Sequence, residues 1–278
     1  MADDTAHETL PPSLPAWARL PINRCNLPPV ILGGLNFQEN PIPLRLDGVF
    51  PFHAELFAML ESLPDAATRA ARFVDYMTVH FCLETPEEAG GMAKRHRTKA
   101  DYTRILRGWF FDADGREAAV IKGWVESRFG LLTRFHKGRL HAGDDMTDQR
   151  FAFERAKGVY GTHALDAQLD LLYAYAQYEQ ALLPETHLIL YRGVNGIEDF
   201  DILERTAKRE ATVVLNAMNS FTRNPERASE FGDNVLEARI PREKVFCTSD
   251  LLPGRLKGEN EVMVIGGAYR VRLSYWAG

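Results

Sequence analysis

The stretch GENEVMVI at residues 258–265 decides how this chain is interpreted, because two carboxylates open an otherwise apolar run. The apolar residues after Glu261 favour a buried strand. Strand alternation puts Glu259 and Glu261 on one face and close together. Like charges so placed raise one another's pKa and indicate a functional site, whereas a pair facing solvent would simply be hydrated.

Short apolar runs of the same kind fill the rest of the chain after Pro184. Turn-forming residues bound each run, which is typical of strands. A short helix is predicted at residues 225–231, with Asn224 as its N-cap and Pro225 at its first position. We therefore predict a sheet-rich unit over residues 184–278, with strands at 187–194, 211–215, 234–240, 261–265 and 268–276.

Apolar residues three and four positions apart replace this pattern upstream, as in Leu56, Leu60 and Leu63. Residues 51–183 are therefore predicted to be a helical region. Its helices are expected at 98–111, at 115–134 and, as one long helix or a pair broken near Gly158 and Gly161, at 148–182.

The first 50 residues are rich in proline and are predicted to be an extended arm that wraps around the domain, with extended chain and turns at 26–36. The predicted fold class is therefore α+β, in which a mainly helical region packs on a C-terminal β core.

The bulk composition excludes several classes of protein. A net charge of −5 argues against a domain that neutralises nucleic-acid phosphates, and no apolar run is long enough to span a bilayer. Three scattered cysteines and eight histidines, His136 and His141 among them, form no zinc motif, so we expect no metal. No export signal is visible, and we expect a cytoplasmic protein.

Two polar motifs have ordinary interpretations. The basic run at residues 94–99 is interpreted as a solvated loop or helix start, with an acidic partner surface as the alternative. The segment DADG at 112–115 lacks the glutamate that a calcium loop needs, so we interpret it as a turn. Neither the glycine pattern of a Rossmann site nor that of a P-loop is present, so a nucleotide would have to be held in another way.

Two further features precede the carboxylates along the chain. Arg192 ends an apolar strand and is suited to grip a phosphate or carboxylate, while Gly193 allows a backbone or ligand to approach closely. Ser220 and Thr222 would share one face of a strand, with Phe221 on the other. Taken singly, each feature also fits an ordinary surface residue.

The order Arg, then Ser-x-Thr, then Glu-x-Glu resembles the site of mono-ADP-ribosyltransferases that modify arginine. Phe221 stands where that family has the middle Thr of its Ser-Thr-Ser strand. The resemblance implies a two-sheet β core that clasps NAD, which is a substrate and the donor of ADP-ribose. It implies that Glu261 stabilises the transition state by gripping the nicotinamide ribose, and that Glu259 orients the acceptor guanidinium.

The same resemblance implies that Arg192 and Gly193 hold NAD, and that Ser220, Phe221 and Thr222 complete its site. It also implies that residues 248–258 form the loop that recognises the acceptor. The segment LPINRCNLPP at residues 20–29 is similar to one branch of the family. That branch inactivates the nitrogenase iron protein by modifying a surface arginine, which regulates nitrogen fixation, and is linked to PII signalling proteins. The alternatives are an NAD glycohydrolase and a non-catalytic module that senses NAD.

Overall fold

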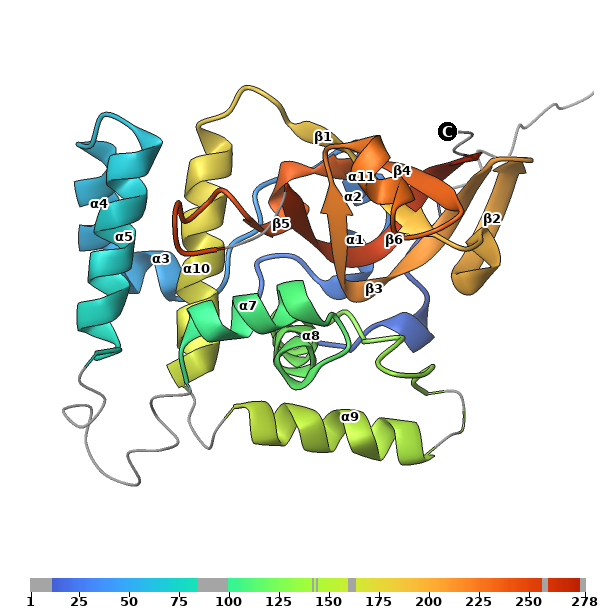
Figure 1. The fold of residues 1–278 in the computed structure, drawn as a ribbon, viewed down its shortest axis with the longest axis horizontal. Helices are drawn as coiled ribbons and strands as arrows, with labels where there is room; N and C mark the ends of the chain where they lie inside the picture. The colour runs from blue at the N-terminus through green and yellow to red at the C-terminus, as the bar shows by residue number, and fades with distance from the viewer. Residues whose placement is uncertain are drawn as a thin grey trace, which may run out of the picture.

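The computed structural model describes residues 12–84, 100–141, 143, 145–159, 164–256 and 260–275. Helices occupy the N-terminal half, and a six-stranded antiparallel sheet follows in the C-terminal part (Figure 1). The predicted α+β class is therefore confirmed. No helix within these ranges is long and apolar enough to cross a membrane.

The N-terminal arm has short helices where extended chain with turns was predicted at 26–36, so that part of the prediction is wrong. It contains the helical turn η1 (Ala16–Ala18) and the short helices α1 (Pro29–Leu32) and α2 (Leu35–Glu39). Pro29 stands at the first helical position, where its fixed φ favours a helix. Burial of apolar side chains such as Phe37 then holds these turns against the core.

The helical region agrees closely with the predicted periodicity. It contains α3 (Val49–Phe52), α4 (Ala54–Glu61), α5 (Ala66–His80), α7 (Tyr102–Phe111), α8 (Arg116–Phe129), α9 (Asp145–Gly158) and α10 (Ala164–Ala181). The stretch at 148–182 is a broken pair, and its first helix ends at Gly158 as predicted. Helix α8 stops earlier than predicted because Gly130 takes a left-handed φ of 69°. The basic run at 94–99 lies outside the described residues.

Helices lie below the sheet and at its side in Figure 1. Helices α7 and α8 lie below the sheet, and α9 lies beyond α8. Helix α10 stands at the side of the sheet, with α4 and α5 farther out. Helices α7, α8 and α10 therefore face the strands, and α2 also packs against β4 and β6.

The sheet has the strand order β2-β3-β1-β4-β6-β5, with further pairing between β3 and β6. Its strands are β1 (His187–Val194), β2 (Asp201–Ala207), β3 (Glu210–Thr222), β4 (Asn234–Pro241), β5 (Val245–Thr248) and β6 (Glu261–Tyr275). The helix α11 (Pro225–Ser229) follows β3, and the side chain of Asn224 caps it as predicted. Strands β2 and β5 were not predicted, and the runs at 261–265 and 268–276 form one strand.

The two long strands, β3 and β6, change register together. Their pairing is irregular between Leu215 and Met218. At this point a Cβ on Gly266 would lie 1.9 Å from the carbonyl oxygen of Asn216, so only glycine fits between the strands. The hydrogen-bonded ladder nevertheless continues through the irregularity, and the strands form one sheet in place of two separate ones.

The larger hydrophobic core crosses from the helices to the sheet. It joins Trp109, Trp124 and Tyr173 of the helices to strand residues such as Phe246 and Met263. A second core lies within the folded sheet itself and includes Leu190 and Phe221. Helices α7 and α8 are thereby fixed against the ends of β3 and β6, where the predicted site residues lie.

Candidate active site

Glu261 and Ser220 meet where β3 ends and β6 begins. In the antiparallel register Thr222 lies opposite Glu261, and Ser220 lies opposite Met263. Ser220 and Glu261 are therefore diagonal neighbours, close enough for side-chain contact. The Ser220 hydroxyl donates a hydrogen bond to Oε1 of Glu261 at 2.5 Å, which is the contact expected of a serine that braces this carboxylate.

Arg192 enters the same site from β1. Its Nη1 donates a 2.8 Å hydrogen bond to the backbone carbonyl of Ser220. Its Nε is buried and has no hydrogen-bond partner among the described residues. Attraction from Glu261 and Asp114 partly offsets the burial that lowers the pKa of the Arg192 guanidinium. Arg192 therefore supplies a buried positive charge beside Glu261, and its Nε–H is a hydrogen-bond donor that no described residue uses.

Trp109 of α7 completes the group, although the sequence did not single it out. Its indole N–H points at both partners and lies 3.0 Å from the Ser220 hydroxyl and 3.1 Å from Oε1 of Glu261. The side chain is only 2% exposed, so the contact is sheltered from water. A residue of the helical region therefore takes part in the site on the sheet.

The pKa of Glu261 is raised, and burial is the largest cause. Hydrogen bonds from Ser220 and Trp109 and the charge of Arg192 act in the opposite direction, since each favours the ionised carboxylate. The sequence suggested mutual repulsion with Glu259 as the source of a raised pKa. Among the described residues, desolvation by burial is the cause that raises the pKa of Glu261.

A cavity of about 230 Å³ lies beside this group. Arg192 and Ser220 line it from the sheet, and Trp109, Lys122 and the turn between α7 and α8 line it from the helices. That turn is the segment at 112–115, whose prediction as a turn is confirmed. The Lys122 ammonium donates to Asp114 at 2.7 Å and so fixes a carboxylate at the edge of the cavity.

The remaining predicted residues on the strands lie around the site and not in the cavity lining. Phe221 is 3% exposed and packs in the core within the sheet, on the face opposite Ser220. The hydroxyl of Thr222 accepts a hydrogen bond from the backbone N–H of Asn224 and shapes the turn into α11. Beside Gly193 the carbonyl of Ala228 leaves no room for a Cβ, so its close neighbour is a backbone.

Glu259 lies outside the described residues, as does the rest of the segment 257–259. Strand β6 begins at Glu261, and Asn260 has a left-handed φ of 57°. Asparagine tolerates this conformation better than most residues. The described part of the strand begins at Glu261, and the shared face of Glu259 and Glu261 stays a prediction.

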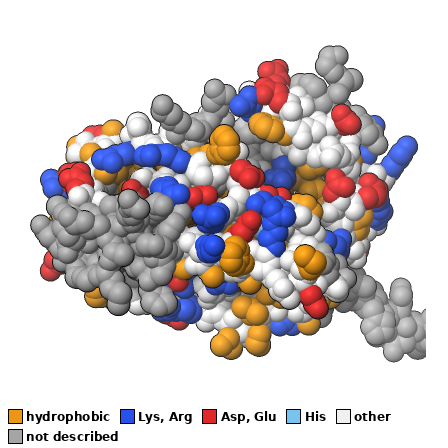
Figure 2. Space-filling model, turned by 60° about the horizontal axis from the view of Figure 1, so that its bottom comes forward, with side chains coloured by type: hydrophobic (Ala, Val, Ile, Leu, Met, Phe, Trp, Pro, Cys, Tyr) orange, Lys and Arg blue, Asp and Glu red, His pale blue; other side chains and the backbone are white. Residues whose placement is uncertain are grey.

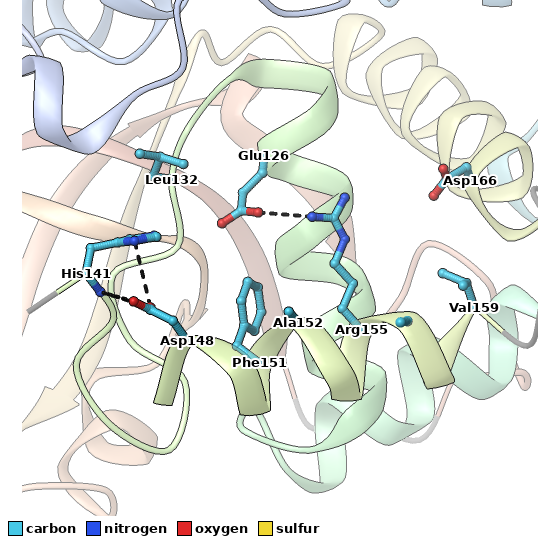
Figure 3. A pocket seen from close by; sticks show the side chains of 10 residues that line it. Glu126, Leu132, His141, Asp148, Phe151, Ala152, Arg155, Val159 and Asp166 are labelled. Carbon is cyan, nitrogen blue, oxygen red and sulfur yellow. Dashed lines mark hydrogen bonds and ion pairs between the residues drawn. The ribbon is translucent and has the colours of Figure 1, made fainter. Parts of the chain in front are cut away.

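A larger cavity of about 710 Å³ lies between α8 and α9 (Figure 3). In Figure 3 Glu126 and Arg155 point toward one another above Phe151, with His141 and Asp148 paired at one side. None of the predicted site residues lines it.

Acidic and basic side chains are interspersed on the face in Figure 2, which shows no continuous basic area. Within the described ranges no group of side chains is suited to hold a metal.

Comparison with known proteins finds a matching family and a similar protein. The chain matches the family model described as Dinitrogenase reductase ADP-ribosyltransferase over residues 22–273, a range that includes Arg192, Ser220 and Glu261. A protein of Rhodospirillum rubrum named NAD(+)--dinitrogen-reductase ADP-D-ribosyltransferase is 34% identical over 262 residues, which cover 91% of this chain and 94% of that protein. No solved structure gives a significant match.

Proposed function

Since this chain belongs to the dinitrogenase reductase ADP-ribosyltransferase family, we propose that it transfers ADP-ribose from NAD to an arginine side chain of the nitrogenase iron protein. Such a transfer would inactivate the iron protein and so regulate nitrogen fixation. The observation that carries the proposal is the Glu261 carboxylate, which Ser220 and Trp109 hold through one oxygen. The other oxygen has no hydrogen-bond partner among the described residues and is available to a ribose hydroxyl.

The reaction breaks the bond between C1′ of the ribose and the nicotinamide nitrogen. The electron pair of that bond leaves with nicotinamide, and positive charge develops on the sugar as in glycoside hydrolysis. An ionised Glu261 that accepts a hydrogen bond from the 2′-hydroxyl would stabilise this charge in a site that is already organised. A guanidinium nitrogen then forms the new bond to C1′ and loses a proton.

The acceptor needs a carboxylate of its own, because a guanidinium stays protonated near neutral pH. We propose Glu259 for this role, since a carboxylate orients a guanidinium bidentately and can take the proton as the bond forms. The loop from Thr248 into β6 would recognise the protein substrate. Leu251, Leu252 and Leu256 anchor this loop in the core, while residues 253–255 are exposed.

NAD would lie over the cavity beside Ser220. Arg192 has an unpaired buried Nε there, which suits a phosphate or ribose oxygen of NAD. Gly193, Thr222 and Phe221 lie outside the cavity lining and would support the strands that carry Arg192 and Ser220. The two halves of the bent sheet, on either side of Gly266, would correspond to the two sheets of the ADP-ribosyltransferase fold.

The named relative acts on dinitrogen reductase, so the iron protein is the acceptor we propose. A PII-type protein is the regulator that the family resemblance suggests, and both partners would place the enzyme in the cytoplasm. The exposed surfaces of the helical region would serve for docking, because Glu261 and Ser220 lie next to Trp109 of that region.

Incubation with NAD labelled in the adenylate part and purified iron protein tests the proposal. We expect label on the iron protein, released with an arginine-linked fragment that mass spectrometry locates. Glu261→Gln should abolish transfer. Glu210→Gln is the matched control, since Glu210 is exposed at the far end of β3 from Ser220.

The outcomes separate the alternatives. Label found only as free ADP-ribose would identify an NAD glycohydrolase. Binding of NAD without consumption by the wild-type protein would identify a sensing module. Normal transfer by Glu261→Gln would remove Glu261 from the mechanism, and label on another residue type would contradict the arginine specificity.

A further inference from the structure

One indole N–H joins the helical region to the proposed catalytic carboxylate. Trp109 lies on α7, and its Nε1 is 3.0 Å from the Ser220 hydroxyl and 3.1 Å from Oε1 of Glu261. The Ser220 hydroxyl donates its own hydrogen to the same Oε1 at 2.5 Å. A single carboxylate oxygen thus receives two donors, one from the sheet and one from the helices.

Both donors bind Oε1 of Glu261, which leaves Oε2 for a different role. With Oε1 held by Ser220 and Trp109, rotation of the carboxyl group would break both hydrogen bonds. Oε2 is therefore kept in one direction and has no donor among the described residues. A fixed, free oxygen is what a carboxylate needs in order to meet a ribose hydroxyl without reorganisation.

The packing of Trp109 shows that its direction is determined. The ring is 2% exposed in the core that joins helices and sheet, and the ammonium of Lys122 lies 6.0 Å from the ring centroid. Asp101 caps α7 by accepting from the backbone N–H of Thr103 at 2.7 Å, which sets where the helix begins. The indole therefore has little freedom to turn away from Glu261.

We propose that Trp109 is a positioning residue for the transferase reaction, which holds the Glu261 carboxylate in its productive orientation together with Ser220. This inference rests on the proposed function of Glu261. It assigns the helical region a part in the chemistry, in addition to any part in docking.

A change in the ionisation of Glu261 is a second consequence. Trp109 is one of the groups that oppose the burial of this carboxylate, so loss of its N–H raises the pKa of Glu261 further. Among the described residues, Arg192 of β1 and Cys247 of β5 also face Glu261, and burial keeps Cys247 a neutral thiol by raising its pKa. Across the cavity stand Asp114 and Lys122, which are paired with each other.

The test replaces the donor and keeps the bulk. Trp109→Phe should lower kcat for ADP-ribose transfer about 10- to 100-fold, the effect of losing a hydrogen bond to a charged group. The KM for NAD should change less than about 3-fold, because the lost contact is to Glu261 and not to NAD. The acid limb of the pH profile should move to higher pH. Loss of Trp109 should also be non-additive with Ser220→Ala, since both act on Oε1.

Trp124→Phe is the matched control. Trp124 is also buried in the same core, and its indole donates to the carboxylate of Asp170 at 2.7 Å, away from the site. It should lose comparable stability and retain the wild-type kcat and pH profile. If Trp109→Phe does not fold, 3-benzothienylalanine at position 109 keeps the ring shape and replaces the N–H by sulfur.

Carbon-13 NMR of labelled glutamate separates this inference from the proposed function. The Glu261 signal is assigned by its loss in Glu261→Gln, and its pKa is then read without any enzymatic assay. A higher pKa in the Trp109 variants supports the contact even if the iron protein proves not to be the acceptor. An unchanged pKa and an unchanged kcat, or a loss of activity no greater than that of Trp124→Phe, would overturn the inference.

Discussion

In the proposed mechanism, Glu261 acts as an ionised carboxylate in a place that disfavours its charge. Burial raises its pKa, and the attraction of Arg192 together with two hydrogen bonds only partly compensates. If Glu261 has this role, it supports catalysis at the expense of stability, as is common at active sites. The cost belongs to the charged form alone.

Glu261→Gln should therefore stabilise the protein while it abolishes transfer. Because the pKa of Glu261 is raised in the folded chain, folding takes up a proton, and wild-type stability falls as the pH rises through the interval from the unfolded pKa of 4.5 to the raised folded value. The uncharged amide avoids this loss. We expect Tm to increase by about 2–4 °C at neutral pH, which corresponds to about 1 kcal/mol for a chain of this size.

Calorimetry of both proteins as a function of pH checks this prediction. The difference in Tm should disappear below the pH at which Glu261 is protonated in both states. A Gln variant that is less stable than the wild type at neutral pH would show that the charge of Glu261 supports the fold.

The residues of the site differ in how visible they are in the sequence. Arg192, Ser220 and Glu261 stand on successive predicted strands, and the resemblance of their order to a known family predicted that they would meet. Trp109 lies in the run WFF on an amphipathic helix, where a buried tryptophan indicates only a core. Nothing local shows that its N–H points at a carboxylate 152 positions away in sequence.

At the scale of elements, the bend shared by β3 and β6 sets the relation between the site and the core. Asn216 stands at the irregularity, and its side chain accepts from the backbone N–H of Arg134 at 2.8 Å. The bend is thus tied to the loop after α8. It lies four residues before Ser220 and five residues after Glu261 on the paired strands.

Gly266→Ala should damage this bend. The new Cβ would lie 1.9 Å from the carbonyl oxygen of Asn216, which belongs to the backbone and cannot rotate away. We expect a loss of about 3 kcal/mol in the free energy of unfolding, at the upper end for overpacking. Gly48→Ala is the control, because no atom lies within 4 Å of the added carbon and only the cost of a left-handed φ of 77°, about 1 kcal/mol, applies.

Urea denaturation of the two variants measures the difference. Equal losses would mean that the strands separate easily at the bend and that glycine is not required there.

Elements with strong periodicity were predictable, and short or exposed ones were not. The apolar alternation of β1 gave its bounds, and Asn224 with Pro225 gave the start of α11. Strand β2 has the sequence DILERTA, whose charges suit its position at the edge of the sheet but hide its strand character. Strand β5 has only four residues and is held by pairing with β6, which no local pattern shows.

At the scale of the whole molecule, the larger core includes side chains from both sides of the predicted boundary at residues 183 and 184. Trp124 of α8 packs against Phe246 of β5 with ring centroids 4.9 Å apart. Tyr173 of α10 donates a 2.8 Å hydrogen bond to the carbonyl of Glu243 beside that strand. The sheet therefore depends on the helices for one of its faces.

Residues 184–278 on their own should accordingly fail to fold. Phe246, Met263 and Ile265 are fully buried in the larger core of the intact chain. Without the helices, these side chains would be exposed to water. Burial of a large apolar side chain contributes about 1.5–3 kcal/mol, so the loss of several such side chains exceeds the margin by which most domains are stable. We expect this fragment to give no cooperative thermal transition by circular dichroism, and we expect the full chain to unfold in a single transition that all probes report together. A well-dispersed amide NMR spectrum from the fragment, with NAD binding intact, would show instead that the sheet is an independent domain and that Trp109 adds to a site already formed.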